Sequence, residues 1–227
     1  MKKILTGCIF LLLIAVGVNP GAALADDDHA DRLVIRRDVD RFAVLPDGVR
    51  FPEGITANPA NGDIYVGTFD APSPTNPNPN NKLLRFDRNG HLLASRDFGN
   101  TPLLGLEFKD NKVYICNVGN FAGVASKIQR IAANFTPTST IEDVAVIPAA
   151  TGTLVRTVLN PDGSTDTITF GSGARVPNAL AFNTSGALFV SDSFQGAIFR
   201  IDNAATCTTP CAVTTFVHDP LLATAGF

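Results

Sequence analysis

Two short motifs place an oxygen-bearing side chain directly before an apolar strand, where it could bind a metal ion. Glu53 lies in the motif F-P-E-G-I at 51–55, and Asn178 lies in V-P-N-A-L at 176–180. Carboxylate and amide oxygens are ligands of calcium, which takes six to eight oxygens. If both side chains point to one centre, they could share one hard cation. The alternative is that each side chain only caps the turn after its proline, and the spacing leaves both interpretations open.

Each motif opens a strand–turn–strand unit, and a third unit lies between them. The units cover residues 51–68, 104–115 and 178–190, followed by short basic strands at 82–87, 127–131 and 197–202. Their first-strand residues Ile55, Leu106 and Leu180 are 51 and 74 residues apart. The arginines of the basic strands, at 85, 130 and 200, are 45 and 70 apart. Such a period with insertions is typical of a propeller blade, a four-stranded antiparallel sheet.

These repeats predict an all-β chain, a β-propeller of four-stranded blades with about three blades present. The predicted propeller domain covers residues 41–227. Three blades cannot close a ring, so we expect a propeller that is incomplete and truncated at its C-terminus, with completion of the ring by partners as the alternative. Further strands are predicted at 41–45, 92–95 and 213–217, and a separate hairpin at 155–159 and 165–170. In the propeller, the residue before each inner strand should face the central channel.

The composition and the N-terminus limit the possible partners and the location. The 227 residues carry a net charge of −3 and 45% hydrophobic residues, which argues against nucleic acid or an anionic membrane as the main partner. A basic start, an apolar run and A-L-A at 23–25 predict a signal peptide over 1–25. We expect cleavage after Ala25, a flexible leader at 26–40, export to the periplasm or outside the cell, and no membrane association afterwards. The oligomeric state is not predicted.

The cysteines fit an exported protein. Cys207 and Cys211, four residues apart, predict a loop disulfide, with a redox or metal pair as the alternative. Cys116 lies in a strand pattern and is expected to be a buried small apolar residue. Asp192 lies in S-D-S after a strand, where we expect its carboxylate to accept hydrogen bonds from backbone N–H groups.

The motifs around Glu53 and Asn178 resemble those of the gluconolactonase/senescence-marker-protein family, with NHL-repeat proteins nearby. That family consists of calcium-dependent six-bladed propellers, with E-G-[PIL] in the first blade and P-N-G-[IL] in a later one. The resemblance implies that Glu53 and Asn178 bind a channel calcium, which activates lactone, ester or phosphoester substrates. Ala179 departs from the pattern, because it stands where the family has glycine.

The resemblance leads to two hypotheses of different kinds. The first is an exported calcium-dependent hydrolase of lactone- or ester-type small molecules, with its catalytic residue unassigned. The family takes further ligands from later blades, and two ligands do not make a calcium site, so this chain should bind calcium weakly or not at all. The second hypothesis is a non-catalytic, NHL-like binding module that presents loops 71–81 and 149–175 to a partner.

Overall fold

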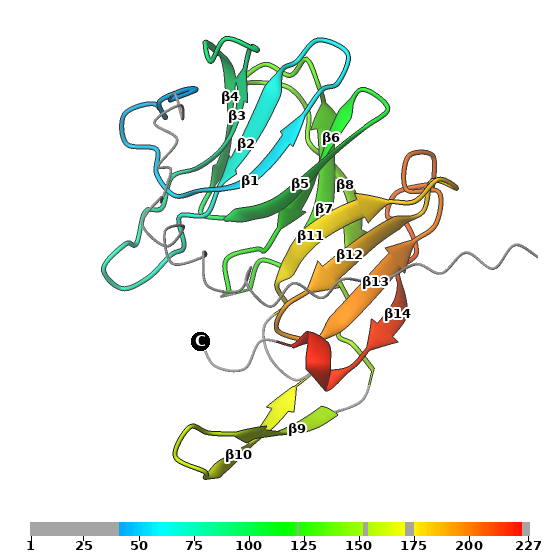
Figure 1. Cartoon of the computed structure of the whole chain (residues 1–227). Helices are drawn as coiled ribbons and strands as arrows, with labels where there is room; N and C mark the ends of the chain where they lie inside the picture. Colours follow the sequence, from blue (N-terminus) through cyan, green and yellow to red (C-terminus); the bar gives the residue numbers. More distant parts are fainter. Residues whose placement is uncertain (1–40, 122, 152–153, 171–174, 224–227) are drawn as a thin grey trace, which may run out of the picture. The chain divides into compact units, whose positions relative to one another are not determined.

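The computed structural model describes residues 41–121, 123–151, 154–170 and 175–223 (Figure 1). The predicted signal peptide, residues 1–25, and leader, residues 26–40, lie outside these residues and stay predictions. The regular secondary structure of the described residues is all β-strand except for one short 3-10 helix, η1 (Pro220–Leu222). None of the helical structure described is long and apolar enough to cross a membrane.

Three sheets have the same make-up: four antiparallel strands in sequence order. The first sheet contains β1 (Pro52–Ala57), β2 (Ile64–Thr68), β3 (Asn81–Phe86) and β4 (Leu92–Gly99). The second contains β5 (Leu103–Lys109), β6 (Lys112–Asn117), β7 (Lys127–Ala132) and β8 (Glu142–Val146). The third contains β11 (Pro177–Phe182), β12 (Leu188–Asp192), β13 (Ala197–Ile201) and β14 (Thr214–His218). The three predicted units and their basic strands are confirmed.

The sheets pack as propeller blades. Their inner strands β1, β5 and β11 lie side by side, with β5 in the middle. One apolar cluster fills the interface of blades 1 and 2; its buried members include Tyr65, Leu83, Leu106 and Ile131. A second fills the interface of blades 2 and 3; its buried members include Leu104, Tyr114, Leu188 and Phe199. The fold is therefore an all-β propeller of four-stranded blades, and the described residues form three blades of an incomplete ring.

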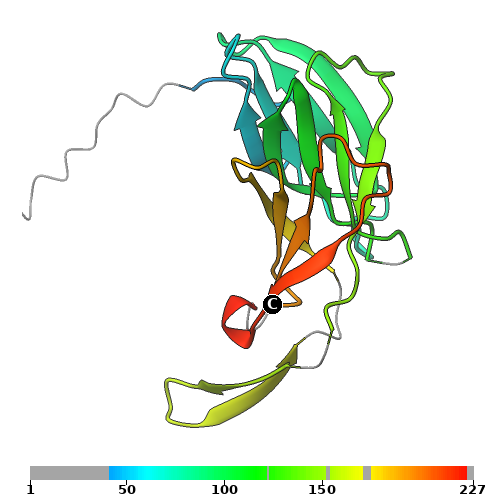
Figure 2. The ribbon, with the colours of Figure 1, turned by 90° about the vertical axis from the view of Figure 1, so that its right-hand side faces the viewer.

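The hairpin forms a separate two-stranded sheet, as predicted. It consists of β9 (Leu154–Leu159) and β10 (Thr165–Phe170), inserted between β8 and β11. Figure 2 shows it apart from the three blades. In β10, Ile168 and Phe170 alternate with threonines, and β9 carries apolar pairs at both ends, on either side of the turn at 160–163.

The predicted strand at 41–45 is wrong. This segment has no ladder hydrogen bonds. The ring of Phe42 packs edge-on against Phe86, 6.4 Å between centroids. Phe42 and Val44 nevertheless remain 46% and 63% exposed, so the apolar pattern at 41–45 indicated neither a strand partner nor burial.

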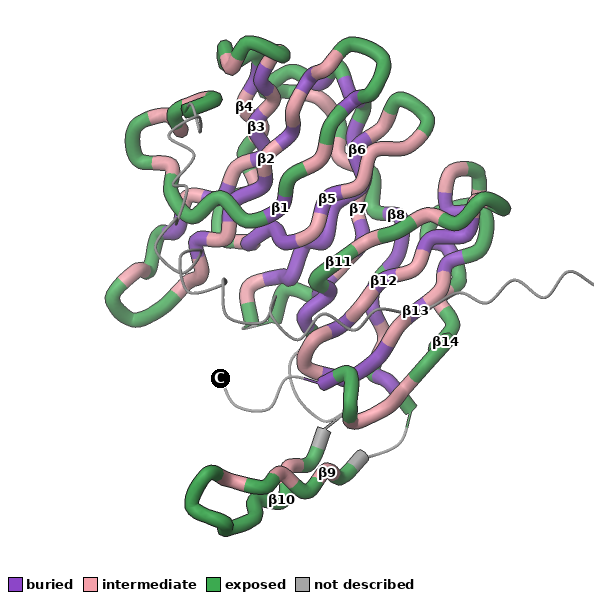
Figure 3. Tube along the Cα trace, viewed as in Figure 1, coloured by how far each residue is buried: buried purple, intermediate pink, exposed green. Residues whose placement is uncertain are grey.

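The two outer blades each keep an apolar face that no other described blade covers. Ile55 of β1 is 66% exposed and Phe216 of β14 is 56% exposed. Leu106, which takes the place of Ile55 in blade 2, is 6% exposed. Figure 3 shows the same contrast, with buried stretches along β5–β7 and exposed residues along β14. A blade-facing position is thus buried only where a neighbouring blade is present.

The cysteine predictions are confirmed. Cys207 and Cys211 form a disulfide with their Cα atoms 5.7 Å apart. The backbone N–H of Cys211 donates to the carbonyl of Val144 at 2.7 Å, so the loop is attached to blade 2. Cys116 is free and fully buried, and burial raises the pKa of its thiol far above the ordinary value. It therefore behaves as a small apolar residue.

A different polar bond crosses each blade interface. Between blades 1 and 2, the hydroxyl of Tyr65 donates to the carbonyl of Ala133 at 3.1 Å. Between blades 2 and 3, the guanidinium of Arg130 donates to the carbonyls of Ala204 and Ala205 at 2.9 and 3.1 Å. Arg130 is 7% exposed, so these bonds are largely shielded from water.

Arg130→Met should lower the free energy of unfolding by about 2 kcal/mol. Two carbonyl oxygens at the interface lose a charged donor, and hydrogen bonds to charged groups contribute roughly 1.5–3 kcal/mol. Glu142 also loses its partner, since Nε of Arg130 lies 2.7 Å from its carboxylate. Urea denaturation of the variant and of the wild type measures the difference.

Arg200→Met is the matched control, because Arg200 takes the same place in blade 3 and pairs with Asp202 near the surface. It should cost less than about 1 kcal/mol, and equal losses would contradict a specific role of Arg130.

The pH dependence of the free energy of unfolding gives a second comparison. The hydrogen bond from Arg130 lowers the pKa of Glu142 from its ordinary 4.5. This contribution is complete above pH 4.5 and is lost as the pH falls through the lowered pKa; Arg130→Met should weaken that dependence, and the part due to Lys112 should remain.

Candidate functional site

The inner strand of every blade begins with the same irregularity. The ladder register shifts between Pro52 and Ile55 in β1, between Leu103 and Leu106 in β5, and between Pro177 and Ala179 in β11. A β-bulge turns side chains away from the regular alternation and is frequent beside functional sites. The residues carried by the three bulges are Glu53, Leu104 and Asn178.

Glycines allow the bulges to approach one another closely. A Cβ atom on Gly54 would overlap the carbonyl oxygen of Leu104, and one on Gly105 would overlap that of Asn178. Only glycine permits a backbone to pack this closely against the next strand. In blade 3 this place belongs to Ala179, which is exposed. The two glycines therefore bring the starts of three inner strands together.

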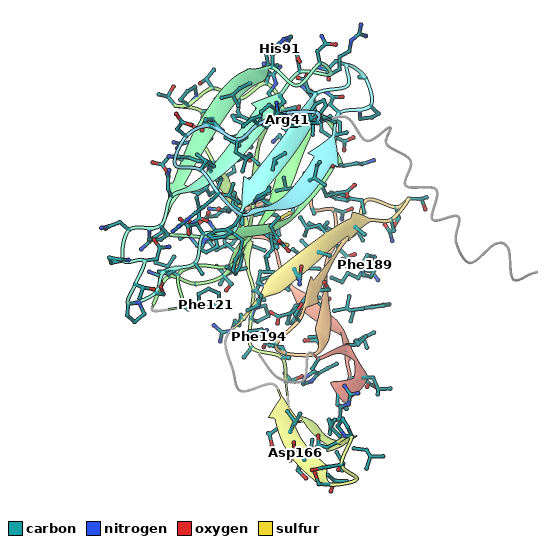
Figure 4. All side chains as sticks on the ribbon, turned by 60° about the vertical axis from the view of Figure 1, so that its left-hand side comes forward. Arg41, His91, Phe121, Asp166, Phe189 and Phe194 are labelled. Carbon is teal, nitrogen blue, oxygen red and sulfur yellow. A yellow bond between two sulfur atoms is a disulfide. The ribbon has the colours of Figure 1, made fainter. Side chains whose placement is uncertain are left out.

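The three bulge residues line one cavity of about 420 Å³. The remaining lining comes from the loops after β2, β6 and β12 and from the start of β11: Phe69, Phe121, Val176, Ser193 and Phe194. Figure 4 shows Phe121 and Phe194 near the start of β11. Glu53 is the only charged residue among the described residues of this lining. The cavity is thus mostly apolar, with a few polar atoms, which is the usual character of a small-molecule site.

The side chains of Asn178 and Glu53 differ in their hydrogen bonding. The amide nitrogen of Asn178 donates to the hydroxyl of Ser193 at 2.8 Å, which leaves the amide oxygen available to a ligand. Glu53 is exposed and makes no hydrogen bond or ion pair with the residues that the structure describes. Its carboxylate can therefore accept from a ligand or bind a cation without first breaking another bond.

The buried carboxylate of Asp192 positions one wall of the cavity. It accepts from the backbone N–H groups of Val176, Phe194 and Gln195 at 3.0, 3.1 and 2.9 Å. Its predicted role toward backbone donors is confirmed. Burial raises the pKa of Asp192, although these donors favour the charged form. Since Val176 and Phe194 both line the cavity, Asp192 acts on the site through them.

The loop after β6 is also held in place. The hydroxyl of Ser126 bonds to the carbonyl oxygens of Val118 and Arg175 at 2.9 and 2.6 Å. The side-chain oxygen of Asn117 accepts from the N–H of Gly119 at 2.9 Å. These bonds connect blade 2 to the segment that enters β11. The ring of Phe121 is therefore presented to the cavity by an anchored loop.

The oxygen ligands that the described residues offer are of the type that calcium binds, but they are too few. Glu53 offers a carboxylate and Asn178 an amide oxygen, both hard oxygen ligands. Within the described residues, no group of three or more histidine, cysteine, aspartate or glutamate side chains could hold a metal. Calcium needs six to eight oxygens, so the described residues do not complete a calcium site by themselves.

Sequence reasoning found Glu53, Asn178 and the bulge position that Leu104 occupies, and it missed the phenylalanines that come from the loops. Phe69 follows β2 directly, and Phe194 follows β12 by two residues. Their place after the second strand of a blade is a signal, because the second strand ends on the face where the inner strand begins. Phe121 gives no such signal, since its direction depends on the turn of its loop.

Comparison with known proteins concerns the fold alone. No protein-family profile matches the chain, and no curated protein sequence matches it. Similar solved structures include a nidogen/laminin complex, with 16% identity over 79% of this chain and a TM-score of 0.43. A catalytically inactive virginiamycin B lyase from Staphylococcus aureus with quinupristin has 16% identity over 78% and a TM-score of 0.36. A streptogramin B lyase has 13% identity over 76% and a TM-score of 0.37.

The matches cover 51%, 58% and 56% of those three chains, so this chain spans little more than half of their length. At these levels of identity and structural agreement, nothing about activity can be carried over to this chain. The assignment rests on its own sheets: three four-stranded antiparallel blades, joined through their inner strands, make it a β-propeller protein.

Proposed function

We propose that the cavity is the substrate site of an exported, calcium-dependent hydrolase of lactones or esters. The supporting observation is that Glu53 and Asn178, 125 residues apart in the sequence, line one largely apolar cavity. The resemblance of their motifs to the gluconolactonase/senescence-marker-protein family suggests the reaction class. The catalytic group is not assigned, and the remaining calcium ligands come from outside the described residues.

The residues of this chain have separate tasks in the proposal. The phenylalanine rings and Val176 cover the apolar part of a substrate and exclude water from it. Asn178, fixed by Ser193, presents its amide oxygen at a defined position. Glu53 supplies the negative charge that a cation requires. Calcium, when bound, would polarise the substrate's carbonyl oxygen.

Glu53→Gln is the direct test. Hydrolysis of γ-butyrolactone and p-nitrophenyl acetate by the complete protein should depend on added calcium, and the variant should lose that activity. Glu107→Gln is the matched control, since Glu107 lies on the inner strand of blade 2 and is absent from the cavity lining. Full activity of the Glu53 variant would refute the assignment.

Calcium binding gives a second readout that needs no substrate. A ligand at about 100 times its dissociation constant stabilises a protein by about 2.7 kcal/mol. The melting temperature of residues 26–227 should change little between calcium and EDTA if the site is incomplete. A large upward shift with calcium would show that this chain holds more of the ligand set than the described residues do.

The non-catalytic binding module remains the second candidate, and the separate β9–β10 hairpin favours it. The exposed residues of β9, Val155 and Leu159 at 58% and 72% exposure, offer an apolar contact surface. Replacement of residues 153–171 by a glycine–serine linker separates the candidates. The hydrolase predicts unchanged hydrolysis after this deletion, whereas the binding module predicts no hydrolysis in either form.

A further inference from the structure

Phe121 lines both the candidate site and a second cavity. This second cavity, of about 320 Å³, is lined by Val118, Phe121, Gly123, Val124, Ala125, Ser126 and Arg175. Phe121 is the only residue common to the described linings of the two cavities. Apart from Ser126 and Arg175, the second lining is apolar or glycine. A mostly apolar space thus adjoins the site at Phe121.

The backbone of Phe121 is held in an unfavourable conformation. Its φ angle is +58°, in the left-handed region that bulky residues rarely adopt. The loop enforces this conformation, because the N–H of Val124 bonds to the side chain of Asn120 at 2.9 Å. A Cβ on Gly119 would overlap the carbonyl of Val124, so the two sides of the loop are closely packed. Such strain is kept only where the surroundings enforce it.

We propose that Phe121 determines the length of ligand that the site accepts, and that the ligand is an ester or lactone with an unbranched apolar chain. This rests on the proposed function for the ester or lactone end, which lies at Glu53 and Asn178. The chain of the ligand extends along the phenylalanine rings and ends at Phe121. Removal of that ring connects the two cavities and gives a longer chain an apolar space.

The chain-length profile of binding follows from this geometry. Each buried CH₂ group contributes about 0.8 kcal/mol, or roughly a fourfold gain in affinity. For the wild type, affinity should rise by this factor with each added CH₂ and then stop rising when the chain reaches Phe121. For Phe121→Gly, the rise should continue over further CH₂ groups. Glycine is the suitable replacement because it also relieves the left-handed backbone, so the variant should fold at least as well.

The chain has no tryptophan, so the fluorescence of one introduced tryptophan can report ligand binding. Phe194→Trp places the only indole on the wall of the cavity. The emission of this protein is titrated with methyl butanoate, hexanoate, octanoate and decanoate, below their critical aggregation concentrations. The same titrations are made in the Phe121→Gly background.

Phe51→Gly is the matched control. Phe51 has a φ angle of +56° and is 54% exposed, close to the +58° and 47% of Phe121, and it is absent from the described linings of both cavities. The proposal expects affinity to keep rising to a longer ligand chain in Phe121→Gly and to stop at the wild-type chain length in Phe51→Gly. Identical profiles in all three backgrounds, or no binding of any methyl ester, would overturn it. Hydrolysis is read separately: chain-length selection without calcium-dependent hydrolysis would reject only the proposed function, and hydrolysis without chain-length selection would reject only this inference.

Discussion

Gly54→Ala should destabilise the protein by about 3 kcal/mol or more. The added methyl group would overlap the carbonyl oxygen of Leu104 and lie 3.0 Å from Cγ of Leu106. Overpacking of a well-packed interior typically costs about 1–3 kcal/mol, and more when the obstacle is backbone. For a domain of this size the melting temperature should fall by roughly 6–12 °C. Thermal unfolding followed by circular dichroism measures it.

Ala179→Gly is the control for this prediction, since residue 179 takes the place of Gly54 in blade 3 and is exposed. Glycine within a strand costs about 0.5–1 kcal/mol relative to alanine, so this variant should melt within a few degrees of the wild type. If Gly54→Ala melted at the wild-type temperature, the close approach of β1 and β5 would be wrong. The convergence of Glu53 and Asn178 on one cavity would then also lose its structural basis.

Leu106→Ala should cost about 3 kcal/mol. Leu106 is 6% exposed and belongs to the cluster between blades 1 and 2. Truncation of a buried leucine to alanine costs roughly 2–5 kcal/mol, because the lost transfer free energy adds to that of the cavity left behind. Urea denaturation should show a lower midpoint at an unchanged slope.

Ile55→Ala tests the same repeat position without a neighbouring blade. Ile55 faces the uncovered side of blade 1 and is 66% exposed, so its truncation should cost less than about 1 kcal/mol. A loss as large as that of Leu106→Ala would mean that blade 1 is covered in solution by something that the described residues do not include. The pair therefore measures how much of the interface energy depends on a neighbouring blade.

The sequence predicted the fold because the repeats carry two independent signals. The period-two alternation of apolar residues identifies strands, as in β2, and the spacing of Arg85, Arg130 and Arg200 identifies the blade. Both signals are local, so neither needs knowledge of tertiary contacts. The disulfide of Cys207 and Cys211 was predictable for the same reason, since the two residues lie close together in the chain.

The rest of the site depends on contacts between distant segments. Nothing in the residues around Arg130 indicates that its guanidinium reaches Ala204, 74 residues away. The strand predicted at 41–45 was wrong because an apolar alternation also occurs in an extended segment without a ladder partner; Phe42 and Val44 are 46% and 63% exposed. Phe121 has a φ angle of +58°, which bulky residues rarely adopt, so sequence preferences predict a different conformation for its loop.

The different bonds at the two blade interfaces bear on how repeats of this kind can diverge. The three blades share one strand order, yet the buried bond across one interface comes from a neutral phenol and the buried bond across the other comes from a guanidinium. Exchange of two blades by recombination would bring together a donor and a surface that lack the matching acceptors. The buried bond at each interface thus favours one order of the blades over the others.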